Sequence, residues 1–261
     1  MYEECYDFIF ITESWLHAGI STGLLDPNSA FSIIRRDRPQ DRHGGICAII
    51  NKKWSVTEVT LGVEYCDLEI VCFDVSRVRP AIRIFVIYRP PYSDDVSVGN
   101  LRNIIECVEK PAVTNRVNII VGDLNMPKIN WLTLTSPSDK INKPFLDSMV
   151  EHGFCQYVKF PTHICNNILD IILADDDQII NQVETDSPLG NSDHVMVKFK
   201  IAINSENPTQ SASEGYYSWH TADYSSMEAY LDCYDWQSLI CSNPSAISTW
   251  AQHSPQCCIL Q

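Results

Sequence analysis

The sequence lacks any apolar run that approaches the roughly 20 residues needed for a membrane-spanning helix. No secretory signal is visible either, because residues 1–4 include two glutamates and no basic residue. Both absences predict a protein that is neither secreted nor held in a membrane. We therefore expect an intracellular location, nuclear or cytoplasmic.

Paired CxxC motifs are also missing, although the 261-residue chain contains 11 cysteines. An odd number of irregularly spaced cysteines without a signal peptide favours reduced thiols over a disulfide framework. A structural zinc site is not expected. Residues 258–261 fit the C-a-a-X prenylation pattern, but no polybasic stretch accompanies Cys258, and we interpret the match as coincidental.

Basic residues are few and unevenly placed. The formal net charge is −14, and no Lys or Arg follows Lys200, whereas six acidic residues do. This balance argues against a non-specific grip on nucleic acid, which depends on clustered positive charge. It leaves open a metal-dependent site that acts on phosphates, because such sites are themselves rich in carboxylates.

Short, β-branched apolar runs dominate residues 1–203 and predict strands, and two amphipathic stretches predict helices. Several runs, such as 84–87, are apolar on both faces, which is typical of central strands covered on both sides. The mixture favours one layered α/β domain over 1–203, followed by a polar linker and acidic tail over 204–261. The strands are expected at 7–12, 31–35, 46–51, 68–75, 82–88, 117–121, 169–174 and 195–203, and the helices at 94–109 and 143–152.

The sharpest chemical signal follows the apolar run that ends at Val121. Gly122 is followed by Asp123 and, two residues later, Asn125. A strand end that presents a carboxylate and a carboxamide can take a proton from water and hold that water or a phosphate oxygen. The alternative is a turn, because Gly, Asp and Asn are also turn residues.

Two further signals also lie beside apolar runs. Asp193 and His194 precede the run that begins at Val195, where an imidazole can bond a phosphoryl oxygen. Glu13 follows the first strand and is a plausible Mg²⁺ ligand, because that ion prefers hard oxygen donors. A capped surface loop and a solvated glutamate are the respective alternatives.

The remaining signals are a strand that ends in Tyr88-Arg89 before two prolines, and Asp170 within an apolar strand after the sequence Phe-Pro-Thr-His. Tyr hydroxyl and Arg guanidinium groups both bind phosphates. A buried carboxylate such as Asp170 needs a partner, because an unpaired charge in an apolar environment is costly.

These motifs form an ordered set that resembles the endonuclease/exonuclease/phosphatase superfamily. The set is most similar to the apurinic/apyrimidinic-type endonuclease domain of non-LTR (LINE-like) retrotransposons, and the resemblance covers residues 6–203. It implies a DNase I-like, four-layer α/β sandwich of two mixed β-sheets flanked by helices. In chain order the motifs are Glu13, Gly44-Gly45-Ile46, Tyr88-Arg89-Pro90-Pro91, Gly122-Asp123-Leu124-Asn125, Leu169-Asp170-Ile171-Ile172-Leu173 and Ser192-Asp193-His194.

The resemblance implies hydrolysis of a DNA phosphodiester by in-line attack of water. Catalytic roles carry over to Tyr88 at the phosphate, to Asp123 and Asn125 at the attacking water, and to Asp170 paired with His194. Residues 217–236 are similar to the connector between endonuclease and reverse transcriptase in these elements. That similarity implies a fused reverse transcriptase as the partner in an intact element, with DNA as the substrate.

The resemblance also implies a metal site and phosphate contacts. Glu13 and Asp193 match metal-binding positions, with Mg²⁺ as the expected ion and Mn²⁺ as a substitute. Thr162, Ser192 and Arg89 match polar groups at the phosphate. A basic cluster is a candidate contact to the DNA backbone. Its members are Arg35, Arg36, Arg38, Arg42, Lys52 and Lys53.

One departure from the family pattern concerns the beginning of the domain. The family's first strand carries an Asn and precedes the metal-binding Glu by a strand and a helix, whereas only twelve residues precede Glu13. We expect a missing core strand, an open sheet edge beside residues 7–12, and a weak or inactive enzyme. The alternatives are a phosphatase of the same superfamily that acts on a small phosphate ester, and a non-catalytic retroelement remnant.

Overall fold

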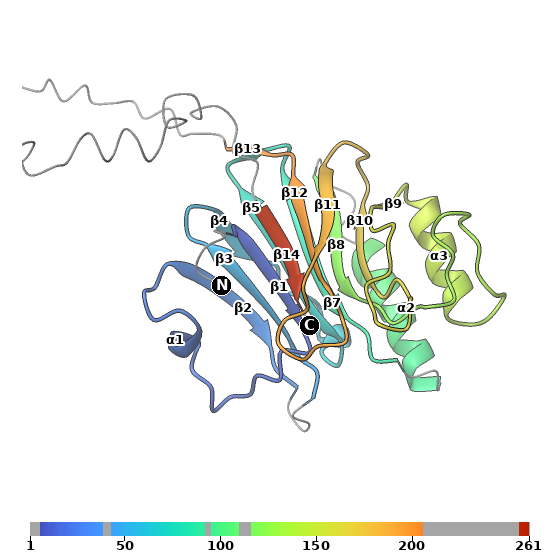
Figure 1. The fold of residues 1–261 in the computed structure, drawn as a ribbon, viewed down its shortest axis with the longest axis horizontal. Helices are drawn as coiled ribbons and strands as arrows, with labels where there is room; N and C mark the ends of the chain where they lie inside the picture. The colour runs from blue at the N-terminus through green and yellow to red at the C-terminus, as the bar shows by residue number, and fades with distance from the viewer. Residues whose placement is uncertain (1–5, 39–42, 92–94, 110–115, 206–255, 261) are drawn as a thin grey trace, which may run out of the picture. The chain divides into compact units, whose positions relative to one another are not determined.

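The computed structural model describes residues 6–38, 43–91, 95–109, 116–205 and 256–260 (Figure 1). The predicted helix start at Asp94, the basic residue Arg42 and the predicted connector lie outside these ranges. No helix in the described part of the chain is both long and apolar enough to cross a membrane.

The first sheet has six strands and buries one of its faces. Along β1, Phe8 and Phe10 are fully buried and alternate with half-buried Ile9 and Ile11, as expected for a strand with one face against a core. All neighbours are antiparallel except β14 and β1. In spatial order the strands are β11 (Ile180–Asp186), β12 (Met196–Ile201), β14 (Gln256–Leu260), β1 (Phe8–Thr12), β3 (Ile46–Asn51) and β2 (Phe31–Arg36).

The second sheet also has six strands, and its central strands β7, β8 and β10 are buried along their whole length. This confirms that apolar runs without alternation predict strands covered on both sides. β7 and β8 are parallel and are connected through helix α2, as a parallel pair requires. In spatial order the strands are β4 (Ser55–Glu58), β5 (Glu69–Ser76), β7 (Ile82–Tyr88), β8 (Val117–Asp123), β10 (Asp170–Ala174) and β9 (Cys155–Gln156).

The two sheets pack face to face, and two helices cover the second sheet (Figure 1). The rings of Phe10 in the first sheet and Phe73 in the second lie 6.5 Å apart. Helices α2 (Asp95–Glu109) and α3 (Asn142–Glu151) bury their apolar sides against the outer face of the second sheet. The α/β sandwich is therefore confirmed. In the described part of the chain, helices cover the outer face of the second sheet but not that of the first.

Minor elements complete the described chain. They are the short helix α1 (Thr22–Leu25), the 3-10 turn η1 (Val63–Tyr65), and the two-stranded ladder of β6 (Val78–Arg79) with β13 (Asn204–Ser205). Helix α3 ends as predicted before Gly153, whose φ of 74° is the left-handed conformation favoured for glycine at this position.

Strand β14 corrects the expectation of an open sheet edge. It lies between β1 and β12, parallel to β1 and antiparallel to β12 (Figure 1), so the predicted open edge beside residues 7–12 is filled. β14 thus belongs to the same compact unit as β1 and β12. Cys258 is 1% exposed within β14, and its thiol is therefore inaccessible to a prenyl group in this fold.

Candidate active site

An open cleft of about 930 Å³ gathers most of the predicted site residues. Its carboxylates are those of Glu13, Asp123 and Asp193, and no Lys or Arg side chain lines it within the described ranges. The cleft is therefore strongly acidic. Asn125, Ser192 and His194 are also part of its lining.

Glu13 lies in a strained turn at the end of β1. Its φ is 50° and that of Trp15 is 53°, a left-handed conformation that costs non-glycine residues about 1–3 kcal/mol and is concentrated at functional sites. The Glu13 carboxylate accepts hydrogen bonds from the hydroxyl of Tyr88 and from Trp15 Nε1, the latter at 3.3 Å. Burial and the Glu13 contact raise the pKa of Tyr88 far above its usual value, so this hydroxyl stays a donor.

Gly122 lets β8 deliver Asp123 into the cleft. Its φ is +128°, and a Cβ at this position would lie 2.1 Å from the carbonyl oxygen of Ile87, so no other residue fits without movement of the backbone. The fully buried Asp123 carboxylate accepts hydrogen bonds from the backbone N–H and the side-chain Nδ2 of Asn125, both at 2.8 Å. Asn125 Nδ2 also donates to the carbonyl of Arg89 at 2.9 Å, which fixes the pair.

Arg89 makes contacts that the sequence analysis does not predict. Its guanidinium is buried beneath the Asp123–Asn125 turn and donates to the carbonyls of Leu124 and Asn125 and to the hydroxyl of Ser97. Burial lowers its pKa from the ordinary value, against the opposing charge of Asp123. Arg89 therefore supports the Asp123–Asn125 turn from below.

The predicted contact between Asp170 and His194 is confirmed. Asp170 Oδ2 lies 2.7 Å from His194 Nδ1, and both side chains are buried. Asp170 also lies directly opposite Asp123 in the β8–β10 ladder. Burial lowers the pKa of His194, but the Asp170 hydrogen bond and the charges of Asp170, Asp123 and Asp193 outweigh it, so the pKa is raised.

The loop that follows Phe160 pairs with the loop that carries His194. His163 forms an isolated β-bridge with His194, and the two rings lie edge to face at 4.8 Å. His163 Nε2 lies 3.1 Å from Asp193 Oδ2, and the Ser192 hydroxyl accepts the His194 N–H at 3.0 Å. His163 was not among the predicted site residues, although it directly follows Thr162 in a motif that the sequence analysis identified.

Thr162 also makes contacts that the sequence analysis does not predict. Its side chain is fully buried, and Oγ1 accepts the backbone N–H groups of Leu169 and Asp170, both at 3.0 Å. It therefore holds the beginning of β10, and through it Asp170, rather than a phosphate oxygen. The corresponding signal in the sequence, a Thr before an apolar strand, does not distinguish these two roles.

The basic cluster is bonded internally. Every described member has an acceptor within the chain, and Arg36 and Lys52 bond carbonyl oxygens, which leave their charges uncompensated. The contacts are Arg35 with Asp37 and the carbonyls of His17 and Ile20, Arg36 with the carbonyl of Cys66, Arg38 with Glu69, Lys52 with the carbonyl of Ser29, and Lys53 with Asp7.

Comparisons with known proteins agree with this geometry. Residues 82–198 match a family model described as "Endonuclease-reverse transcriptase". No curated protein has a sequence that matches this chain. Among solved structures, the endonuclease domain of TRAS1, a telomere-specific non-LTR retrotransposon, is 14% identical with a TM-score of 0.55, and the match covers 76% of this chain and 98% of that one.

Two other structures have the same fold. An AP endonuclease from Archaeoglobus fulgidus is 12% identical, has a TM-score of 0.57, and matches over 75% of this chain and 89% of its own. The 3′ phosphatase NExo from Neisseria, bound to a product DNA hairpin, is 12% identical, has a TM-score of 0.58, and matches over 75% and 88%. Residues 82–198 thus resemble the endonuclease–reverse transcriptase family, and the chain shares its fold with a retrotransposon endonuclease and an AP endonuclease.

Proposed function

We propose that the chain is a divalent-metal-dependent endonuclease that hydrolyses DNA phosphodiester bonds. The observation that carries this proposal is the meeting, in one acidic cleft, of the Asp123–Asn125 pair and the Asp170–His194 pair. The Asp123–Asn125 pair can receive a proton from water, and the Asp170–His194 pair can stabilise charge on the phosphate. A hydrolysis needs both functions.

The residues present fit a divalent cation. Glu13 and Asp193 contribute carboxylate oxygens to the cleft, and Asp193 lies within 4.8 Å of ligand atoms of His163 and His194. Hard oxygen donors suit Mg²⁺, with Mn²⁺ as a substitute, and we assign Glu13 and Asp193 as the residues that would hold the ion. When bound, the ion would neutralise charge that develops on the phosphate and the leaving oxygen.

The chain's own residues act on water and phosphate. Asp123, held by two bonds from Asn125, orients the attacking water and receives its proton while the water oxygen forms the new bond to phosphorus. The raised pKa of His194 favours the imidazolium, which donates to a phosphoryl oxygen as the bond to the leaving oxygen breaks. Asp170 fixes the orientation of this ring.

The test is conversion of supercoiled plasmid to nicked circles, measured beside phosphate release from small monoesters. We expect nicking that requires a divalent ion, disappears in EDTA, and is lost in the Glu13→Gln and His194→Ala variants. Monoester hydrolysis without nicking would instead support the phosphatase alternative. Absence of both activities in a cooperatively folded chain would support the non-catalytic alternative.

Further parts of the proposal concern the origin of the chain. The match to an endonuclease–reverse transcriptase family and the likeness to a retrotransposon endonuclease support a LINE-like source, in which a reverse transcriptase is fused to the nuclease. An intracellular location, where chromosomal DNA is the target, belongs to the same proposal. Detection of a reverse transcriptase reading frame continuous with this one would test the fusion.

A further inference from the structure

The acidic cleft leaves the charge of a polyanionic substrate only partly compensated. A bound divalent ion would neutralise the phosphate that is cleaved, but the flanking phosphates of a nucleic acid strand would still face Glu13, Asp123 and Asp193. Proteins that bind nucleic acid backbones compensate such phosphates with Lys or Arg. The described members of the basic cluster do not supply them here, because none of them lines this cleft or the pocket beside it.

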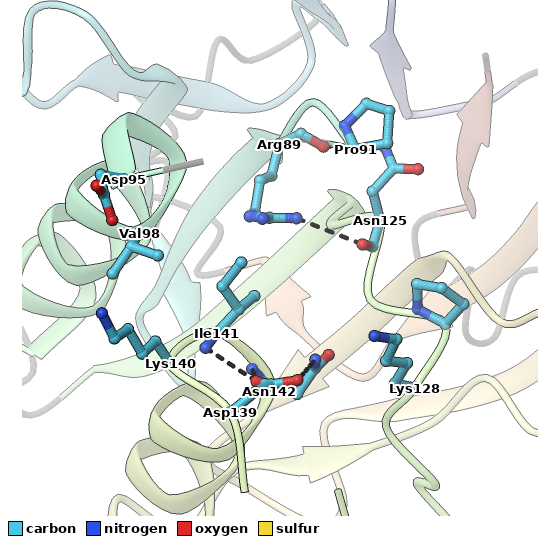
Figure 2. Close-up of a pocket in the computed structure, with 11 residues that line it drawn as sticks. Arg89, Pro91, Asp95, Val98, Asn125, Lys128, Asp139, Lys140, Ile141 and Asn142 are labelled. Carbon is cyan, nitrogen blue, oxygen red and sulfur yellow. Dashed lines mark hydrogen bonds between the residues drawn. The ribbon is translucent and has the colours of Figure 1, made fainter. Parts of the chain in front are cut away.

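A second pocket of about 490 Å³ adjoins the cleft and carries lysines. The two cavities share Pro91 and Asn125, and the second one is also lined by Lys128 and Lys140 (Figure 2). Figure 2 shows these two lysines on opposite sides of the pocket, with Arg89 and Asn125 at its upper edge. A strand that enters the cleft would thus continue into a pocket with cations on both walls.

Both lysines stand on fixed backbone. Lys128 follows the Asp123–Asn125 turn and lies between Met126 and Ile129. Both of these side chains are buried in the core between the second sheet and its two helices. Lys140 lies in the bend just before α3, directly after Asp139, which accepts the N–H groups of Ile141 and Asn142. A side chain on rigid backbone loses less conformational freedom when a ligand binds than one on a loose loop.

The charges of both lysines are available to a ligand. Neither Lys128 nor Lys140 forms a salt bridge or hydrogen bond in the part of the chain that the structure describes, and both are exposed. The charge of Lys128 does act on the Asp139 carboxylate, whose pKa it helps to lower. The nearby Asp139 carboxylate is occupied, because it accepts the N–H of Ile141 and both the N–H and the Nδ2 of Asn142. Asp95, which also lines the pocket, is the remaining acid there.

We infer that Lys128 and Lys140 bind the phosphodiester backbone that flanks the cleaved bond. The pocket is then an extension of the substrate site that grips the strand by charge and carries no base specificity. This inference rests on the proposed endonuclease function. The two lysines are binding residues, so their loss should raise KM with little change in kcat.

The experiment measures binding of fluorescein-labelled duplex DNA to the full chain by fluorescence anisotropy, in EDTA, over a series of salt concentrations. The variants are Lys128→Gln, Lys140→Gln and the double variant. Lys200→Gln is the matched control. Lys200 lies near the C-terminal end of β12 and lines neither cavity. Lys128→Arg retains the positive charge.

Each single glutamine variant should bind DNA about threefold to tenfold more weakly than the wild type at low salt. The slope of log affinity against log salt concentration should become shallower by about 1, the value for one phosphate contact. Lys200→Gln and Lys128→Arg should bind like the wild type, and thermal melts should show that every variant is folded. In nicking assays the double variant should raise KM and spare kcat.

Two results would overturn the inference and can be distinguished. If the wild type nicks and binds DNA but the double variant has unchanged affinity and salt slope, the lysine pocket is not a backbone site and the proposed function stands. If Lys200→Gln weakens binding as much as Lys128→Gln, the effect is one of net charge and the pocket has no special role. Failure of the wild type to bind or nick any DNA would remove the proposed function itself.

Discussion

The position of β14 makes a quantitative prediction about stability. In the sheet register, Ile259 lies between Phe10 of β1 and Val197 of β12, and all three side chains are at most 1% exposed in the same core cluster. Replacement of Ile259 by Ala removes three carbons from a site whose strand is hydrogen-bonded on both sides, so the cavity has little freedom to collapse. Such substitutions cost about 2–5 kcal/mol, and we expect a value of about 3 kcal/mol or more for Ile259→Ala.

The assay is urea unfolding of the wild type and of Ile259→Ala, followed by far-UV circular dichroism. Leu132→Ala is the control, because Leu132 is 89% exposed and its loss should change the free energy of unfolding by less than about 0.5 kcal/mol. A chain that ends at Pro255 should be less stable still, since β1 and β12 would both present unpaired backbone groups. A loss below about 1 kcal/mol for Ile259→Ala would refute the placement of β14 within the sheet.

Three further predictions concern single residues. Gly122→Ala should abolish nicking and lower the melting temperature, because the new Cβ would meet the carbonyl oxygen of Ile87; a fully active variant would contradict this geometry. Asp139→Ala should cost about 1 kcal/mol by loss of the hydrogen bonds from the N–H groups of Ile141 and Asn142 before and at the start of α3, measured by urea unfolding. Burial raises the pKa of Asp139, but the hydrogen bonds from Asn142 and Ile141 and the charge of Lys128 outweigh it, so the pKa is lowered. The ionised Asp139 therefore stabilises the fold above the unfolded pKa, and the difference between wild type and variant should vanish as pH falls through the folded pKa. Asp170→Asn should reduce single-turnover nicking about 10³-fold or more by misorienting His194, and an unimpaired variant would exclude that role.

Much of the fold was predictable because most of its strands have a recognisable local sequence pattern. The runs at 82–88 and 117–121 are apolar on both faces, and β7 and β8 are indeed buried along their length. β11 was missed because its exposed edge position leaves a mostly polar sequence without a periodic signal. β14 was missed because five residues at a distance from the domain in sequence give no indication of a pairing that tertiary structure alone creates.

Those parts of the site that lie in short sequence motifs were predictable. The buried acid Asp170 needed a donor, and the structure places His194 in hydrogen-bonding contact with it. The contacts of Arg89 and Thr162 could not be predicted, because a sequence shows that a side chain can bond phosphate but not which backbone carbonyls or N–H groups lie beside it. Lys128 could not be recognised at all, since its significance lies in a pocket formed with the beginning of α3.

The most direct test of the account is plasmid nicking by the purified full chain with Mg²⁺, compared with the same protein in EDTA and with the His194→Ala variant in Mg²⁺. The acidic cleft and the Asp170–His194 pair predict nicked circles with wild type and Mg²⁺ only. Nicking that persists in chelator, or that His194→Ala retains at the wild-type rate while the chain stays folded, would contradict the assignment of this cleft as a metal-dependent endonuclease site.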